Sequence, residues 1–63
     1  MDMLKTMNDM IMNLVHGVDD DTLDRYDDFY QTVDIESLNT YESIAYNELD
    51  RLLWMAYSVA YEH

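Results

Sequence analysis

The residues of this chain with the clearest chemical potential are eight carboxylic acids gathered between positions 19 and 36. They are Asp19, Asp20, Asp21, Asp24, Asp27, Asp28, Asp34 and Glu36. Clustered carboxylates bind divalent cations, exchange protons in pairs, or present negative charge to a basic partner. The spacing of the acids and the residues between them decide which of these three chemistries is open to the chain.

The spacing of the acids does not match a dedicated metal site. A calcium loop has acids at its positions 1, 3 and 5, glycine at position 6 and glutamate at position 12. Counted from Asp19, the last three of these positions hold leucine, aspartate and tyrosine. A di-iron site in a helical bundle needs Glu-x-x-His pairs, and neither histidine follows a glutamate at that spacing. The chain also lacks cysteine, so we predict no metal and no cofactor.

The same acids lack the surroundings that catalysis needs. Paired carboxylates act as acid and base when a pocket separates their pKa values. Here the aspartates fall on the solvent-facing side of a short predicted helix, where a run of charge is usually hydrated surface. No serine–histidine arrangement or phosphate-binding loop accompanies them. We therefore predict a protein that binds rather than an enzyme, with no catalytic residues.

The charge of the whole chain narrows the choice of partner. Its 63 residues include 14 acids and 3 bases, which give a formal net charge of −11. Nucleic acids and anionic membranes would repel such a chain, so we expect it to bind neither of them directly. A basic protein surface, such as that of a nucleic-acid-binding protein or a nuclease complex, is the partner that this charge favours.

The charge is dense enough in one segment to imitate a nucleic acid. Spread over the ~4,200 Å² that a folded chain of this mass exposes, eleven charges would give ~390 Å² per charge. Duplex DNA has roughly 110 Å² per charge. Residues 19–36 hold eight acids and one arginine, a net charge of −7. If this segment exposes about 900 Å², its density is ~130 Å² per charge, close to that of the duplex.

The acidic and apolar residues of this segment separate onto two sides of a helix predicted over about residues 22–32. The aspartates at 19–21 supply N-caps at the end where the helix dipole favours negative charge. At 100° per residue, the apolar arc consists of Leu23, Tyr26, Phe29, Tyr30 and Val33. The arc nearly opposite consists of Asp20, Asp21, Asp24, Asp27 and Asp28. We expect the first arc to pack and the second to face solvent.

The N-terminal segment is predicted to form a helix over about residues 2–16, which Gly17 ends. Met3, Met7 and Met10 follow helical spacing within it. Two interpretations of these methionines stay open: they fill the core of this chain, or the helix pairs with its counterpart in a second copy. A homodimer would offset the marginal stability of a chain this small, which buries only ~60% of its unfolded surface.

The C-terminal segment is predicted to form a helix over about residues 40–61, and this helix has a second notable side. Trp54, Tyr57 and Tyr61 lie at i, i+3 and i+7, away from the leucine and alanine stripe of the same helix. Aromatic residues are enriched at the centres of interfaces, so these three residues are candidates for a contact patch. The alternative is that the other two helices straddle this helix and bury both of its sides.

The connections between the predicted helices complete an all-α architecture. Residues 34–38 are predicted as a connector with room for a single helical turn. Asn39 and Glu42 form a capping-box-like start for the last helix, with Thr40 as the competing cap. No segment alternates with the two-residue period of a strand for long enough to predict one. The sequence therefore predicts a small three-helix bundle that forms a single domain over residues 1–63.

The sequence favours a cytoplasmic location. Apolar residues near the N-terminus are interrupted by Lys5, Asn8, Asp9 and Asn13, whereas a secretory signal has a basic start and an unbroken apolar run. No stretch approaches the ~20 apolar residues of a membrane-spanning helix. We therefore predict no membrane association.

Aspartates and aromatic residues are interleaved in the sequence Asp24-Arg25-Tyr26-Asp27-Asp28-Phe29-Tyr30. With this pattern and its very small size, the chain resembles phage-encoded inhibitors that imitate DNA, among them anti-restriction and anti-CRISPR proteins. The resemblance is one of character over the middle and C-terminal thirds and includes no shared motif. It implies that the protein fills the nucleic-acid channel of a host nuclease, or covers its recognition surface, in the host cytoplasm. The aromatic and methionine content departs from that group and indicates contacts beyond charge.

These observations predict an inhibitor that occupies the nucleic-acid-binding surface of a basic partner. The alternative is an acidic helical interaction or assembly module, which includes a homodimer, that binds through its aromatic and methionine-rich surfaces. The side chains expected to bind the partner are Asp20, Asp21, Asp24, Asp27, Asp28, Asp34, Glu36, Trp54, Tyr57 and Tyr61.

Overall fold

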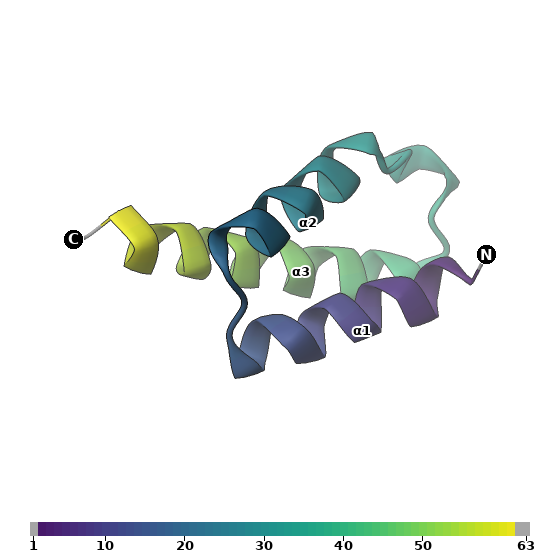
Figure 1. Ribbon diagram of the computed structural model, residues 1–63. Coiled ribbons are helices and arrows are strands. Elements are labelled where there is room, and N and C mark those ends of the chain that lie inside the picture. The colour runs from purple at the N-terminus through teal and green to yellow at the C-terminus, as the bar shows by residue number, and fades with distance from the viewer. Residues whose placement is uncertain (1, 62–63) are drawn as a thin grey trace.

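The computed structural model describes residues 2–61, which form three α-helices and one short 3₁₀ turn. The helices are α1 (Met3–His16), α2 (Asp20–Thr32) and α3 (Thr40–Tyr61), and the 3₁₀ turn η1 (Ile35–Ser37) lies between α2 and α3. The first and third helices run in the same direction. The second helix, α2, runs in the opposite direction, from the end of α1 toward the start of α3 (Figure 1). The predicted all-α three-helix bundle is confirmed.

Aspartate caps set where the first two helices begin. The side chain of Asp2 caps α1, which therefore begins at Met3. The side chain of Asp19 accepts a hydrogen bond from the backbone N–H of Thr22 at 2.8 Å. Because Asp19 rather than a later aspartate is the N-cap, α2 begins two residues before its predicted start. Asp20 and Asp21 therefore lie in its first turn, where the helix dipole favours their charge.

The predicted end of α1 and the predicted start of α3 are confirmed. Gly17 ends α1 with a φ of 100°, and its N–H donates to the carbonyl oxygen of Asn13 at 2.9 Å. Asn39 and Glu42 form a reciprocal capping box at the start of α3. The Asn39 side chain accepts from the Glu42 N–H at 2.8 Å, and the Glu42 carboxylate accepts from the Asn39 N–H at 2.9 Å.

The core is small and is centred on α3. Among the described residues it consists of five buried side chains: Met7, Leu23, Ala45, Leu49 and Leu53. Both α1 and α2 pack on α3, and the contact between α1 and α3 is the more extensive. Met3 and Met10 pack beside fully buried Met7, so the methionine stripe of α1 lies within the core of its own chain.

The third helix is longer than the two that pack on it. Its 22 residues span ~33 Å, whereas the 14 residues of α1 span ~21 Å. The C-terminal part of α3 consequently extends past the ends of α1 and α2 (Figure 1). Of the helices among residues 2–61, none has the length and apolar character needed to cross a membrane.

We expect Leu49→Ala to lower the free energy of unfolding by about 2–5 kcal/mol, because the Leu49 side chain is fully buried between the helices. Urea unfolding followed by circular dichroism measures the change. Ile35→Ala removes the same kind of atoms from an exposed side chain in η1, and its effect should stay within about 0.5 kcal/mol. Equal losses in the two variants would contradict a core centred on Leu49.

Candidate functional site

The second helix separates its acidic and apolar side chains as the sequence predicts. Leu23 is buried, and Tyr26, Phe29 and Tyr30 pack against the core. On the opposite side the aspartates reach solvent. Those that are exposed are Asp20, Asp21, Asp24 and Asp28, and Asp27 is half-buried. This side of α2 is called the acidic side below.

The aromatic side of α3 lies next to the acidic side of α2. Trp54 is 70% exposed, whereas Tyr57 is half-buried and packs against the core. The hydroxyl of Tyr57 donates a hydrogen bond to Asp24 Oδ1 at 3.0 Å, which links the two helices. Trp54 therefore has the exposure that a contact patch requires, whereas Tyr57 is partly covered by the packing, as the alternative interpretation expects. The backbone of Tyr61 ends α3, but the position predicted for its side chain lies outside the described side chains.

A cleft of about 350 Å³ separates the two helices beside this hydrogen bond. It is lined by Asp27, Tyr30, Asp50, Leu53, Trp54 and Tyr57. A smaller cavity of about 230 Å³ lies on the other side of Tyr57 and is lined by Asp20, Leu23, Asp24, Tyr57 and Ala60. Asp27 therefore lines the cleft together with Trp54 and Tyr57, whereas Asp20 and Asp24 line the smaller cavity beside Tyr57.

Asp50 is a member of this site that the sequence reasoning missed. Its Oδ1 accepts a hydrogen bond from the Tyr30 hydroxyl at 2.5 Å. The Tyr30 ring stacks on Tyr46 with the ring centroids 4.6 Å apart. The hydrogen bond to Asp50 and partial burial raise the pKa of the Tyr30 hydroxyl. Trp54 and Tyr57 follow Asp50 at i+4 and i+7. This helical spacing is the signal in the sequence that places Asp50 on the aromatic side of α3.

The remaining predicted acids have other surroundings. Hydrogen bonds from the hydroxyl and the backbone N–H of Thr22 hold the pKa of Asp19 below its usual value. Asp34 caps η1 by accepting from the backbone N–H of Glu36 at 3.2 Å. Asp34 and Glu36 are exposed but do not line the cleft. Asp19 and Asp34 are therefore structural caps as well as contributors to the negative charge.

The cleft has the chemical composition of a site for an organic cation. The carboxylates of Asp27 and Asp50 can accept charge-assisted hydrogen bonds from a guanidinium or ammonium group. Asp27 also accepts from the side-chain amide of Gln31 at 2.8 Å, which orients its carboxylate. The Trp54 ring offers a π face beside them. Among the described residues, no group of three acidic or histidine side chains is placed to hold a metal ion.

The fold and the cleft define a small acidic three-helix bundle with an acidic and aromatic hollow between its second and third helices. Compared with known proteins, the chain matches no family model, no curated protein and no solved structure.

We expect Tyr30 to make the stability of the fold depend on alkaline pH. Below pH about 10 the Tyr30 hydroxyl is protonated in both the folded and the unfolded chain, so its hydrogen bond contributes fully. As the pH rises further, the unfolded chain loses this proton first, because folding raises the pKa of Tyr30. The free energy of unfolding therefore falls. Urea unfolding from about pH 8 to about pH 11 measures this slope.

Tyr30→Phe removes the group responsible, so its free energy of unfolding should fall less steeply above pH about 10. Tyr41→Phe is the matched control, since the Tyr41 ring is exposed and lies far along α3 from the cleft. This control should keep the slope of the unaltered chain. A Tyr30→Phe slope identical to that of the unaltered chain would mean that Asp50 does not hold the proton on Tyr30.

Proposed function

We propose that this protein inhibits a basic, nucleic-acid-handling protein by occupying the surface that binds the nucleic acid. The observation that carries the proposal is that Asp27, from the acidic side of α2, and exposed Trp54 of α3 line one cleft, with exposed Asp24 and Asp28 on the same side of α2. The proposed action is binding without catalysis, in the cytoplasm of the host cell, and it needs no cofactor.

The acidic side of α2 supplies the imitation of phosphate. We assign Asp20, Asp24, Asp27 and Asp28 as phosphate surrogates, with exposed Asp21, Asp34 and Glu36 adding to the same field. A groove built to bind phosphates is lined with lysine and arginine, and it attracts a dense array of carboxylates over a distance of several ångströms. Such steering raises the rate of association and disfavours partners that are not basic.

The cleft supplies a contact that charge alone does not give. Arginine is common on surfaces that bind nucleic acid, and its planar guanidinium pairs with carboxylates and stacks on aromatic rings. An arginine of the partner fits between Asp27 and Asp50 with its plane on Trp54. A cation on an exposed aromatic ring gains about 0.5–1 kcal/mol, and more where water is excluded. This combination favours arginine over lysine.

A second function is favoured by the exposure of Trp54. With 70% of its surface open to solvent, this ring can act as the central anchor of an ordinary protein interface. In that case the protein is an acidic interaction or assembly module whose aspartates serve solubility. The two functions differ in whether the aspartates or the tryptophan provide most of the affinity.

Binding of an oligo-arginine peptide tests the part played by charge. Raising the salt concentration from about 0.05 M to about 0.5 M should weaken binding by roughly tenfold or more, because salt screens the carboxylates. The fluorescence of Trp54, the one tryptophan of the chain, reports the binding. An oligo-lysine peptide of equal length should bind more weakly, since ammonium groups do not stack.

The matching variant changes Asp24, Asp27 and Asp28 together to asparagine. Asparagine keeps an oxygen that accepts the hydrogen bond of Tyr57, so the fold is retained while three charges are lost. We expect peptide binding to fall by at least tenfold. Asp9→Asn changes an exposed residue of α1. It is compared with Asp27→Asn as a single-charge control and should have the smaller effect. Unchanged binding by the triple variant would refute mimicry.

Trp54→Ala distinguishes the two functions. Under mimicry, affinity for the peptide falls by about tenfold or less and the salt dependence remains, because a ring on an exposed cleft adds little beyond the charge. If Trp54→Ala abolishes binding while salt has almost no effect, the interaction module is the correct function. Titration calorimetry measures the affinity of the unaltered chain and of Trp54→Ala, because Trp54→Ala has no tryptophan fluorescence.

The inhibitory action itself is tested on the natural target. The unaltered chain is used to capture binding proteins from its native host, and the triple asparagine variant is the control. A target of the proposed kind is captured by the first and not by the second. Adding the unaltered chain should then displace nucleic acid from that target. A target that keeps its nucleic acid while the chain is bound would refute the proposed inhibition.

A further inference from the structure

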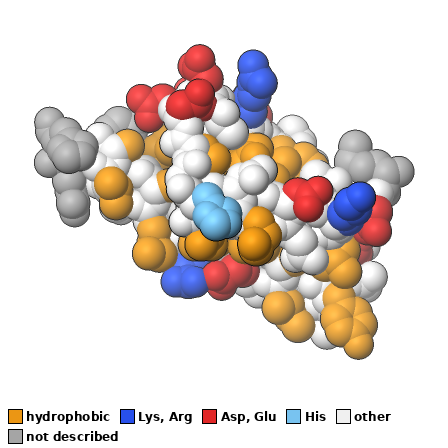
Figure 2. Space-filling model, turned by 60° about the horizontal axis from the view of Figure 1, so that its bottom comes forward, with side chains coloured by type: hydrophobic (Ala, Val, Ile, Leu, Met, Phe, Trp, Pro, Cys, Tyr) orange, Lys and Arg blue, Asp and Glu red, His pale blue; other side chains and the backbone are white. Residues whose placement is uncertain are grey.

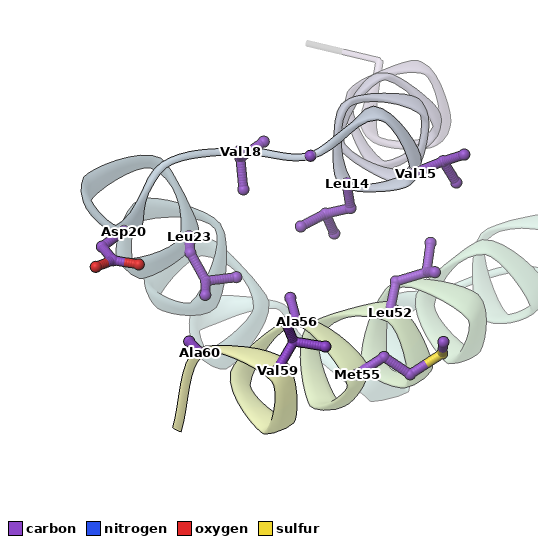
Figure 3. A pocket seen from close by; sticks show the side chains of 11 residues that line it. Leu14, Val15, Val18, Asp20, Leu23, Leu52, Met55, Ala56, Val59 and Ala60 are labelled. Atoms are coloured by element: carbon purple, nitrogen blue, oxygen red, sulfur yellow. The ribbon is translucent and has the colours of Figure 1, made fainter. Parts of the chain in front are cut away.

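One side of the α1–α3 pair, opposite to α2, is left uncovered and is apolar. Six residues there are each more than half exposed: Met12, Val15, Tyr41, Ile44, Met55 and Val59. We call them the α1–α3 face. Figure 3 shows Val15 and Met55 pointing away from α2, and Figure 2 shows hydrophobic side chains spread across the side where α1 comes forward.

Helical spacing places these residues in two neighbouring stripes. Met12 and Val15 are three residues apart on α1, and Tyr41, Ile44, Met55 and Val59 recur on one side of α3. An open groove of about 550 Å³ lies between α1, α3 and the first turn of α2 at one end of the face. Leu14 and Val15 line it from α1, Leu52, Met55 and Val59 line it from α3, and Asp20 and Leu23 line it from α2 (Figure 3).

The charge of this face differs from that of the rest of the molecule. Lys5 continues the stripe of α1, and Glu48 and Arg51 lie within the stripe of α3, where they form an ion pair. The Arg51 guanidinium also contacts the sulfur of Met55 at 3.5 Å. Asp9, which is exposed and follows Lys5 by one helical turn, adds a negative charge beside this stripe. These four charged residues sum to zero, in a chain whose net charge is −11. Two copies can therefore meet here with their acidic helices held apart.

The area of the face matches what a dimer requires. With about 200 Å² for each large apolar residue, the exposed fractions of the six residues leave roughly 740 Å² open. A stable interface buries about 800 Å² on each partner, and the largest apolar patch of a monomer is usually about 300–600 Å². The patch is thus large for a monomer and sufficient for one partner.

We propose that a second copy of this chain covers the α1–α3 face. A nearly neutral apolar face can pair with the same face of a second copy through a two-fold axis. Such an interface needs only a surface that is complementary to itself. The five-residue core of the described chain also leaves a monomer with little apolar burial. Because α2 lies on the opposite side, each dimer presents two acidic sides outward. This inference stands whether or not the acidic sides bind a basic target.

The test is the oligomeric state in solution, measured by light scattering or sedimentation from low to high micromolar concentration. We expect the unaltered chain to have twice the 7.5 kDa mass of one copy at the upper end. Val15→Lys and Met55→Lys each place charge on exposed positions of the face, so both should remain folded and become monomeric. Ile35→Lys changes an equally exposed side chain in η1 and should remain dimeric.

Circular dichroism of each variant confirms that the helices are intact, so a loss of dimer is not a loss of fold. Salt gives a second measurement, because it screens the repulsion between two copies of a −11 chain and should strengthen the dimer. The affinity for a basic target should change in the opposite direction and weaken as salt is added. An unaltered chain that is monomeric at high micromolar concentration, or variants of Val15 and Met55 that both remain dimeric, would overturn the proposal.

Discussion

The packing of α3 against both other helices is the constraint on which the rest of the structure depends. Leu49 and Leu53 of α3 are buried, and each of the other helices contributes one buried residue, Met7 from α1 and Leu23 from α2. Each neighbouring helix covers only part of the circumference of α3, so two helices on adjacent sides of α3 leave its other sides open. One open side holds Trp54 beside α2, and the other forms part of the α1–α3 face. Both proposed surfaces therefore result from the same packing arrangement.

Polar contacts, in addition to apolar burial, fix α2 on α3. Within α2 one residue, Leu23, is buried, which leaves the position of the helix along α3 weakly specified by packing alone. The hydrogen bonds of Tyr30 to Asp50 and of Tyr57 to Asp24 join the two helices at separate points, and the stacking of Tyr30 on Tyr46 adds a third contact. Hydrogen bonds have directional requirements that apolar contacts lack. The same contacts set the shape of the cleft, so the binding site and the helix register have a common origin.

The sequence predicted the features that depend on residues close together in the chain. The caps at Gly17 and Asn39 are local hydrogen-bonding patterns, and the two arcs of α2 follow from helical periodicity, so both could be read directly. The predicted start of α2 is two residues late because three consecutive aspartates compete as caps, and only the hydrogen bond to Thr22 selects Asp19. The partnership of Tyr30 with Asp50 joins residues 20 positions apart and depends on how α2 crosses α3, which periodicity does not determine. For the same reason periodicity predicts the acidic and aromatic residues as separate patches, although Asp27, Trp54 and Tyr57 line one cleft.

The uneven distribution of charge explains how so acidic a small chain can hold together. Eleven uncompensated charges on one compact molecule destabilise it through mutual repulsion. Asp19, Asp20 and Asp21 lie at the N-terminal end of α2, where the helix dipole offsets part of that repulsion. The Lys5 and Arg51 cations lie instead with the apolar residues of the α1–α3 face, and Arg51 neutralises Glu48 there. Arg25 is the one base within α2, so the eight acids between residues 19 and 36 keep a net charge of −7. The same separation that gives one side its attraction for a basic surface therefore makes the opposite side suitable for contact with an identical, equally acidic chain.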